Sequence, residues 1–141
     1  MAYIENQTVH DADSHVMELP EKILEYLESD YQNEFSEFAA AKLHMPEEIR
    51  AAVKQQDDAV FRADEVHELM LRKNHLALGA FRNTDRPKCL DLLGVSSQLV
   101  FTTAAVGNYG LEEAGKTGLA LAAARAHNRM NADFCSVDKR L

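Results

Sequence analysis

The chain has 141 residues, of which 46% are hydrophobic and 27% are charged, as is typical of one globular domain. Its 15 basic and 23 acidic residues give a net charge of -8 without any clustered basic segment, which argues against a dedicated nucleic-acid-binding protein. The longest run of small apolar residues, 119–124, is too short to span a membrane, and the first residues lack the pattern of a secretory signal.

The N-terminal part of the sequence predicts a strand followed by several short helices. A short strand is expected over residues 7–13, and helical patterns extend over residues 19–56. Pro46 is expected at the first position of one of these helices, because proline fits there and two glutamates follow it in the first turn. Apolar residues at helical spacing define the buried face of the first helix: Ile23, Leu24 and Leu27.

The middle of the chain predicts two more helices. One is expected over residues 64–78, ending at Gly79, and the other over residues 88–93. Pro87 opens this second helix, and Gly94 is placed to end it in the left-handed conformation. The residues expected to be buried by the longer helix are Val66, Leu69, Met70 and Leu76.

A second strand and a long helix are expected in the C-terminal third. Residues 98–102 form an apolar run that predicts a strand buried on both faces. The helix is expected from Leu111 or Thr117 to Phe134, with Arg125 and Arg129 on its solvent side. Its expected apolar stripe consists of Leu119, Ala122, Ala126, Met130 and Phe134.

Strand, helix, strand and helix in this order indicate an α/β fold with a parallel sheet. Two parallel strands alone make a poor sheet, because parallel strands need cover on both faces and more neighbours. A third strand would be expected near residues 136–141, where the sequence ends. We therefore expect an incomplete domain that forms a homo-oligomer or assembles with a complementing chain.

Asp13 and His15 are the candidate metal ligands of this sequence. Side chains alternate along a strand, so these two residues are expected to project the same way. Carboxylate oxygen with imidazole nitrogen suits zinc or another divalent metal. In the alternative interpretation, Asp11 and Asp13 are turn residues that hydrogen-bond nearby backbone, and His15 is simply exposed.

Three segments resemble the amidohydrolase superfamily, in particular its amidohydrolase-2-type branch, which includes the aminocarboxymuconate-semialdehyde decarboxylase type. Residues 9–18, Val-His-Asp-Ala-Asp-Ser-His-Val-Met-Glu, resemble the signature of the first strand. Residues 79–103 resemble the first barrel helix and the second strand, and residues 124–141 the second helix and the approach to strand three. The resemblance runs nearly end to end along the chain, in register, with these three segments as its anchors.

The resemblance implies a (β/α)8 TIM-type barrel, of which residues 1–141 are the N-terminal part of a single, incomplete domain. This part would hold two strands, a helical insertion over residues 19–80 and the first two barrel helices. Many relatives carry histidine or glutamate at the position of Asp13, and His10 stands where an apolar residue is usual.

The function implied by the resemblance is that of a metal-dependent hydrolase or non-oxidative decarboxylase acting on a small organic substrate. Asp13 and His15 would take the places of the first two metal ligands, with zinc as the expected metal. The remaining ligands and the catalytic aspartate belong to later strands, so residues 1–141 supply no catalytic residue and are expected to be inactive alone.

A nucleotide-binding module is the alternative from another class. Residues 110–117, Gly-Leu-Glu-Glu-Ala-Gly-Lys-Thr, match the written phosphate-loop pattern, with Lys116 as the phosphate-binding residue. Glu112 and Glu113 argue against it, because they would place negative charges beside the phosphates. Six residues also separate the expected strand from Gly110, where the motif needs a direct turn.

Other polar residues give weaker signals. His67 and His75 are two helical turns apart, too far for chelation on one helix, and His44 and His127 have no partner at ligand spacing. A third possibility is a non-catalytic fragment that assembles with another chain. The two cysteines are far apart and lack metal-type spacing, which favours reduced thiols in a cytoplasmic protein.

Overall fold

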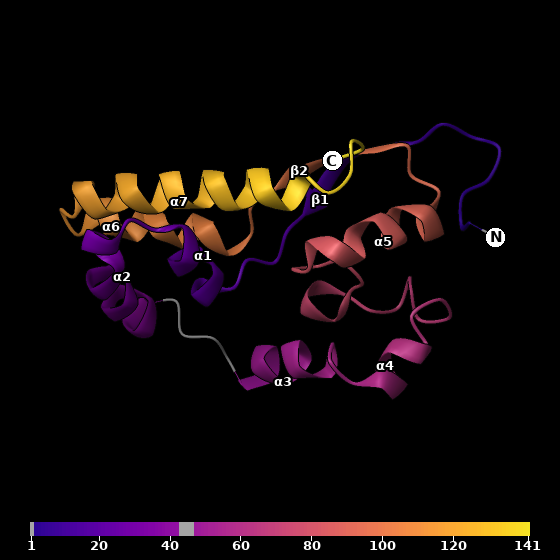
Figure 1. The fold of residues 1–141 in the computed structure, drawn as a ribbon, viewed down its shortest axis with the longest axis horizontal. Coiled ribbons are helices and arrows are strands. Elements are labelled where there is room, and N and C mark those ends of the chain that lie inside the picture. Colours follow the sequence, from indigo (N-terminus) through magenta and orange to yellow (C-terminus); the bar gives the residue numbers. More distant parts are fainter. Residues whose placement is uncertain (1, 43–46) are drawn as a thin grey trace. The chain divides into compact units, whose positions relative to one another are not determined.

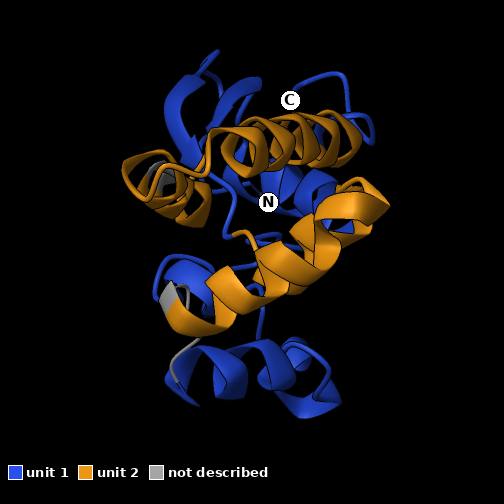
Figure 2. Ribbon diagram, turned by 90° about the vertical axis from the view of Figure 1, so that its left-hand side faces the viewer, with its two compact units in different colours: residues 1–17, 45–101, 135–141 blue, residues 18–44, 102–134 orange. Residues whose placement is uncertain are grey.

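The computed structural model describes residues 2–42 and 47–141 and divides the chain into two compact units. The first, here called the sheet unit, comprises residues 1–17, 45–101 and 135–141 (Figure 2). The second, the helical unit, comprises residues 18–44 and 102–134. Each unit is built from segments that lie far apart in the sequence. The predictions for His44 and Pro46 concern residues outside the described ranges.

The sheet unit contains two parallel strands (Figure 1). β1 (His10–His15) pairs with β2 (Ser97–Phe101), and His10 lies opposite Ser97 while His15 lies opposite Phe101. The register shifts between Asp11 and Ser14, where β1 uses one residue more than β2. The predicted parallel pairing is therefore confirmed, with a bulge that the sequence did not indicate.

Helix α5 (Arg86–Leu93) precedes β2 and has the predicted ends. Pro87 lies in its first turn, and Gly94 ends it with a φ of 80°. Two features favour glycine at position 94. The positive φ disfavours any residue with a side chain, and a Cβ there would lie 2.1 Å from the carbonyl oxygen of Ile4. This glycine therefore serves both the left-handed helix end and the close approach of the N-terminal segment.

The helix predicted over residues 64–78 is wrong. The structure has α3 (Glu47–Gln55) and α4 (Ala59–Ala63), then a series of turns and two short 3-10 helices, η1 (Asn74–Leu76) and η2 (Asn83–Asp85). The apolar pattern misleads here because the buried side chain is that of a charged residue. Glu65 is buried and forms ion pairs with Arg62 and Lys88. Three of the apolar residues near it are exposed instead: Val66, Met70 and Leu71.

The helical unit contains α1 (Pro20–Tyr26), α2 (Ser29–Lys42), η3 (Ala104–Asn108), α6 (Tyr109–Glu113) and most of α7 (Thr117–Cys135) (Figure 1). Its largest fully buried side chains come from four different elements and the predicted stripe of α7 is buried as expected. The core consists of Ile23, Leu27, Phe35, Leu111, Leu119, Ala122, Ala123, Ala126 and Met130.

Strand β2 is not buried on both faces, contrary to the prediction. Leu99 is 59% exposed and Phe101 is 42% exposed. Among the described residues the sheet has only two strands, so most of β2 has a neighbour on one side. The exception is Gln98, whose backbone N–H donates to the carbonyl oxygen of Arg140 at 2.7 Å.

Within the described ranges, none of the helices combines the length and the apolar character needed to cross a membrane.

Candidate functional site

The two predicted metal ligands lie side by side in the sheet unit. The distance between Asp13 Oδ1 and His15 Nε2 is 3.4 Å, and the two side chains are 90% and 40% exposed. The ring of His15 lies 6.0 Å from the ring of Phe101, and its carbonyl oxygen accepts a hydrogen bond from Arg86 at 2.6 Å. Buried Arg86 therefore fixes the backbone that presents the imidazole, and burial lowers the pKa of this guanidinium.

Asp11 has the structural role that the alternative interpretation gives it. One carboxylate oxygen accepts from the backbone N–H of Asp13 at 3.0 Å, and the other accepts from the side-chain amide of Gln98 at 3.0 Å. These bonds hold the bulge in β1 and tie it to β2. Both carboxylate oxygens of Asp11 thus accept hydrogen bonds within the sheet, whereas Asp13 and His15 are exposed to solvent.

The spacing of Asp13 and His15 fits shared binding of one metal ion. Oxygen and nitrogen ligands lie about 2.0–2.2 Å from zinc, so two of them in a tetrahedral site are roughly 3.4 Å apart. The residues present fit two positions of such a site. No group of three or more histidine, cysteine, aspartate or glutamate side chains that could hold a metal occurs within residues 2–42 and 47–141.

A second polar centre, in the helical unit, is built around Glu18. Its side chain has no exposed surface and accepts hydrogen bonds from four donors. Thr102 Oγ1 donates at 2.5 Å, the backbone N–H groups of Thr103 and Ala104 at 3.0 and 2.7 Å, and His127 lies with Nε2 at 3.1 Å. The carboxylate thus joins the start of η3 to the middle of α7.

The charge of Glu18 is set by a competition between burial and hydrogen bonding. Burial raises the pKa of this carboxyl, but the bonds from His127, Thr102 and the backbone of Ala104 lower it by more. The resulting pKa is about 2, so Glu18 is ionised at neutral pH. Because an ionised carboxylate can only accept, His127 Nε2 is the donor in this contact.

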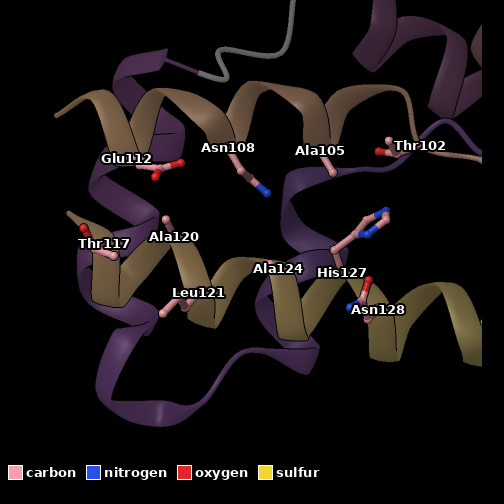
Figure 3. A pocket seen from close by; sticks show the side chains of 10 residues that line it. All are labelled: Thr102, Ala105, Asn108, Glu112, Thr117, Ala120, Leu121, Ala124, His127 and Asn128. Carbon is pink, nitrogen blue, oxygen red and sulfur yellow. The ribbon is translucent and has the colours of Figure 1, made fainter. Parts of the chain in front are cut away.

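His127 also lines a cavity of about 340 Å³ inside the helical unit. Figure 3 shows side chains from η3 and α6 facing side chains from α7 across this space. The walls are mostly apolar in the middle and polar towards both ends. The lining residues are Thr102, Ala105, Asn108, Glu112, Thr117, Ala120, Leu121, Ala124, His127 and Asn128.

The sequence did not indicate the Glu18–His127 pair, because His127 has no partner at ligand spacing along the chain. The two residues are 109 positions apart, so no local spacing relates them. Glu18 is the last residue of the segment that resembles the first-strand signature, in which Asp13 and His15 are the predicted ligands. A buried carboxylate cannot be recognised from sequence when its donors come from a distant helix and from backbone N–H groups.

The phosphate-loop pattern does not form a phosphate-binding loop here. Gly110 lies within helix α6, and the turn that follows contains Gly115 with a φ of 74°. Lys116 Nζ is engaged by Glu34 at 2.7 Å. This geometry offers nucleotide binding no support.

Comparisons of the chain with known protein families, with curated proteins and with solved structures find no match. The resemblance to amidohydrolases therefore stays a prediction based on the residues quoted for it.

Proposed function

We propose that this chain provides the first two metal ligands of an amidohydrolase-type enzyme, a hydrolase or non-oxidative decarboxylase of a small organic substrate. The observation that supports the proposal is the 3.4 Å distance between Asp13 Oδ1 and His15 Nε2 at the carboxyl end of β1. Ligands at the carboxyl ends of parallel strands are the usual arrangement in barrel enzymes. The complete (β/α)8 barrel and the choice of zinc belong to the same proposal.

In such a centre, a bound divalent metal supplies Lewis-acid chemistry and makes its water more acidic. The residues of this chain hold and orient it. Asp13 would contribute a carboxylate oxygen and His15 an imidazole nitrogen as ligands. Arg86 holds the carbonyl of His15, and Asp11 holds the bulge that presents Asp13.

Metal binding by matched variants tests the proposal. Zinc is titrated by equilibrium dialysis and measured by elemental analysis in wild type, Asp13→Ala and His15→Ala. Because each substitution removes one of two donors, we expect affinity to fall by about ten-fold or more in both variants.

The control variants are His10→Ala and Asp64→Ala, which remove exposed residues of the same chemical types. Their zinc affinity is expected to equal that of wild type. Unchanged affinity in Asp13→Ala and His15→Ala would reject the metal assignment.

A second proposal concerns assembly. We infer that the chain self-associates or pairs with a complementing chain, because Leu99 and Phe101 leave apolar surface exposed on β2. This proposal does not depend on metal binding.

A further inference from the structure

The cavity of the helical unit has a hollow apolar middle. One wall of the cavity is formed by Ala105 and Asn108 of η3 and by Glu112 of α6. The opposite wall is formed by residues along one face of α7 (Figure 3). Small side chains create the space, since Ala105, Ala120 and Ala124 face it where larger residues would fill it. With about 340 Å³, the cavity has the size of a small-ligand site.

One apolar side chain that lines the cavity, Leu121, is exposed to solvent. Leu121 is well exposed although it lies on the same stripe of α7 as Ala120 and Ala124. The adjacent face of this helix, including Leu119 and Ala122, is buried in the core of the helical unit. The cavity stripe is therefore apolar surface beyond what the described core needs, and it suits the hydrocarbon body of a ligand.

The charged residues at the cavity favour a ligand with a positive charge. None of its lining residues is a lysine or arginine, so an anion would find no permanent cation to pair with. His127 already faces the carboxylate of Glu18. Glu112, in contrast, is exposed and makes no ion pair within the described part of the chain. The nearest lysine in the sequence, Lys116, is bound to Glu34.

We propose that this cavity binds a small organic amine, with its ammonium group beside Glu112 and its hydrocarbon body between Ala105, Ala120 and Ala124. The carboxylate supplies an acceptor and a compensating charge for the ammonium group. The alanines and Leu121 supply apolar contact. This site is separate from Asp13 and His15 and does not rest on the proposed metal chemistry.

Three probes with the same ring test the sign of the charge. Benzylamine, benzyl alcohol and benzoate are titrated into the ¹⁵N-labelled protein, and backbone amide shifts are followed by NMR. We expect benzylamine to bind with about millimolar affinity, benzyl alcohol more weakly and benzoate not at all. The shifts should be confined to residues 102–128. Benzoate binding as well as benzylamine, or no saturable shift with benzylamine, would overturn the proposal.

Matched variants test the residues. Glu112→Gln should weaken benzylamine about three-fold and remove most of its salt dependence, as is typical of an exposed ion pair. Glu113→Gln, which changes the neighbouring carboxylate outside the cavity lining, should not. Equal effects of the two variants would show that the amine responds to overall charge and would reject the site.

A cavity-filling variant gives an independent test. Ala124→Leu should abolish the benzylamine shifts by occupying the space, whereas Ala132→Leu, on an exposed part of α7 outside the cavity, should retain them. Circular dichroism and thermal unfolding verify that both variants fold. Retained binding in folded Ala124→Leu would place the amine elsewhere.

Discussion

At the residue scale, the most consequential side chain of the helical unit is Glu18. An ionised carboxylate can only accept hydrogen bonds, and all four groups around it are donors or can donate. Its charge is therefore matched to its surroundings although the side chain is buried. Removing the charge leaves donors facing one another in a place that water does not reach.

Replacing Glu18 by glutamine is expected to destabilise the protein. The glutamine NH₂ group would face either the N–H groups of Thr103 and Ala104 or the side of Thr102 and His127, so buried donors would lose their acceptor. We expect a loss of about 2–4 kcal/mol in the free energy of unfolding in urea. Glu21→Gln, at an exposed position of α1, should change it by less than about 0.5 kcal/mol. A similar small change for Glu18→Gln would contradict the assigned bonds.

The same carboxyl predicts how stability depends on pH. Its pKa is about 2 in the folded protein against 4.5 in an unfolded chain, so its contribution is complete above about pH 5 and is lost as the pH falls towards 2. A shift of this size corresponds to about 3 kcal/mol. We expect wild type to lose more unfolding free energy than Glu18→Gln between pH 6 and 3, measured by denaturant titration at each pH. Parallel curves for the two proteins would refute this role.

At the element scale, two glycines allow strain to be separated from steric overlap. Gly94 at the end of α5 and Gly115 after α6 have nearly the same φ, 80° and 74°. A Cβ at Gly94 would lie 2.1 Å from the oxygen of Ile4, whereas a Cβ at Gly115 would meet nothing within 4 Å.

Alanine substitutions at these glycines should therefore differ in cost. Gly115→Ala is expected to lose about 1 kcal/mol of unfolding free energy, the cost of a left-handed alanine. Gly94→Ala should lose at least twice as much, because the N-terminal segment must also move away from α5. Chemical denaturation of both variants measures the difference. Equal losses would show that Ile4 is not held against α5 in solution.

The elements also show where sequence patterns succeed and fail. Local signals predicted α5, since Pro87 and Gly94 mark its ends, and the buried stripe of α7, since its apolar residues recur at helical spacing. The pattern over residues 64–78 failed because Glu65 is buried through pairing with Arg62 and Lys88. Lys88 lies on helix α5, 23 positions from Glu65, so the apolar periodicity around Glu65 does not indicate this pairing.

At the scale of the whole molecule, the short sheet has the greatest consequence. Most of β2 has a neighbour on one side only among the described residues, and Leu99 and Phe101 expose apolar surface. Such a strand is a template for pairing with another chain. On its other side, β2 makes a backbone hydrogen bond from Gln98 to Arg140.

Self-association through β2 is a testable consequence. Sedimentation velocity should show that the mass of wild type rises with concentration, and that Leu99→Lys shifts the protein towards the monomer. Leu71→Lys, at a leucine outside β2 that is even more exposed than Leu99, should associate like wild type. A wild-type monomer at every concentration would argue against this surface as an interface.

The sequence by itself determined α5, the buried stripe of α7, the parallel relation of β1 and β2, and the nearness of Asp13 and His15. The last follows because residues two apart on one strand face the same way. Only the tertiary structure decided that Glu18 meets His127, that Glu65 is buried, and that β2 stays exposed. These features depend on where distant segments meet. Periodicity within a segment carries no information about such meetings, so a site made from one strand can be predicted from sequence, and a site made from a loop and a remote helix cannot.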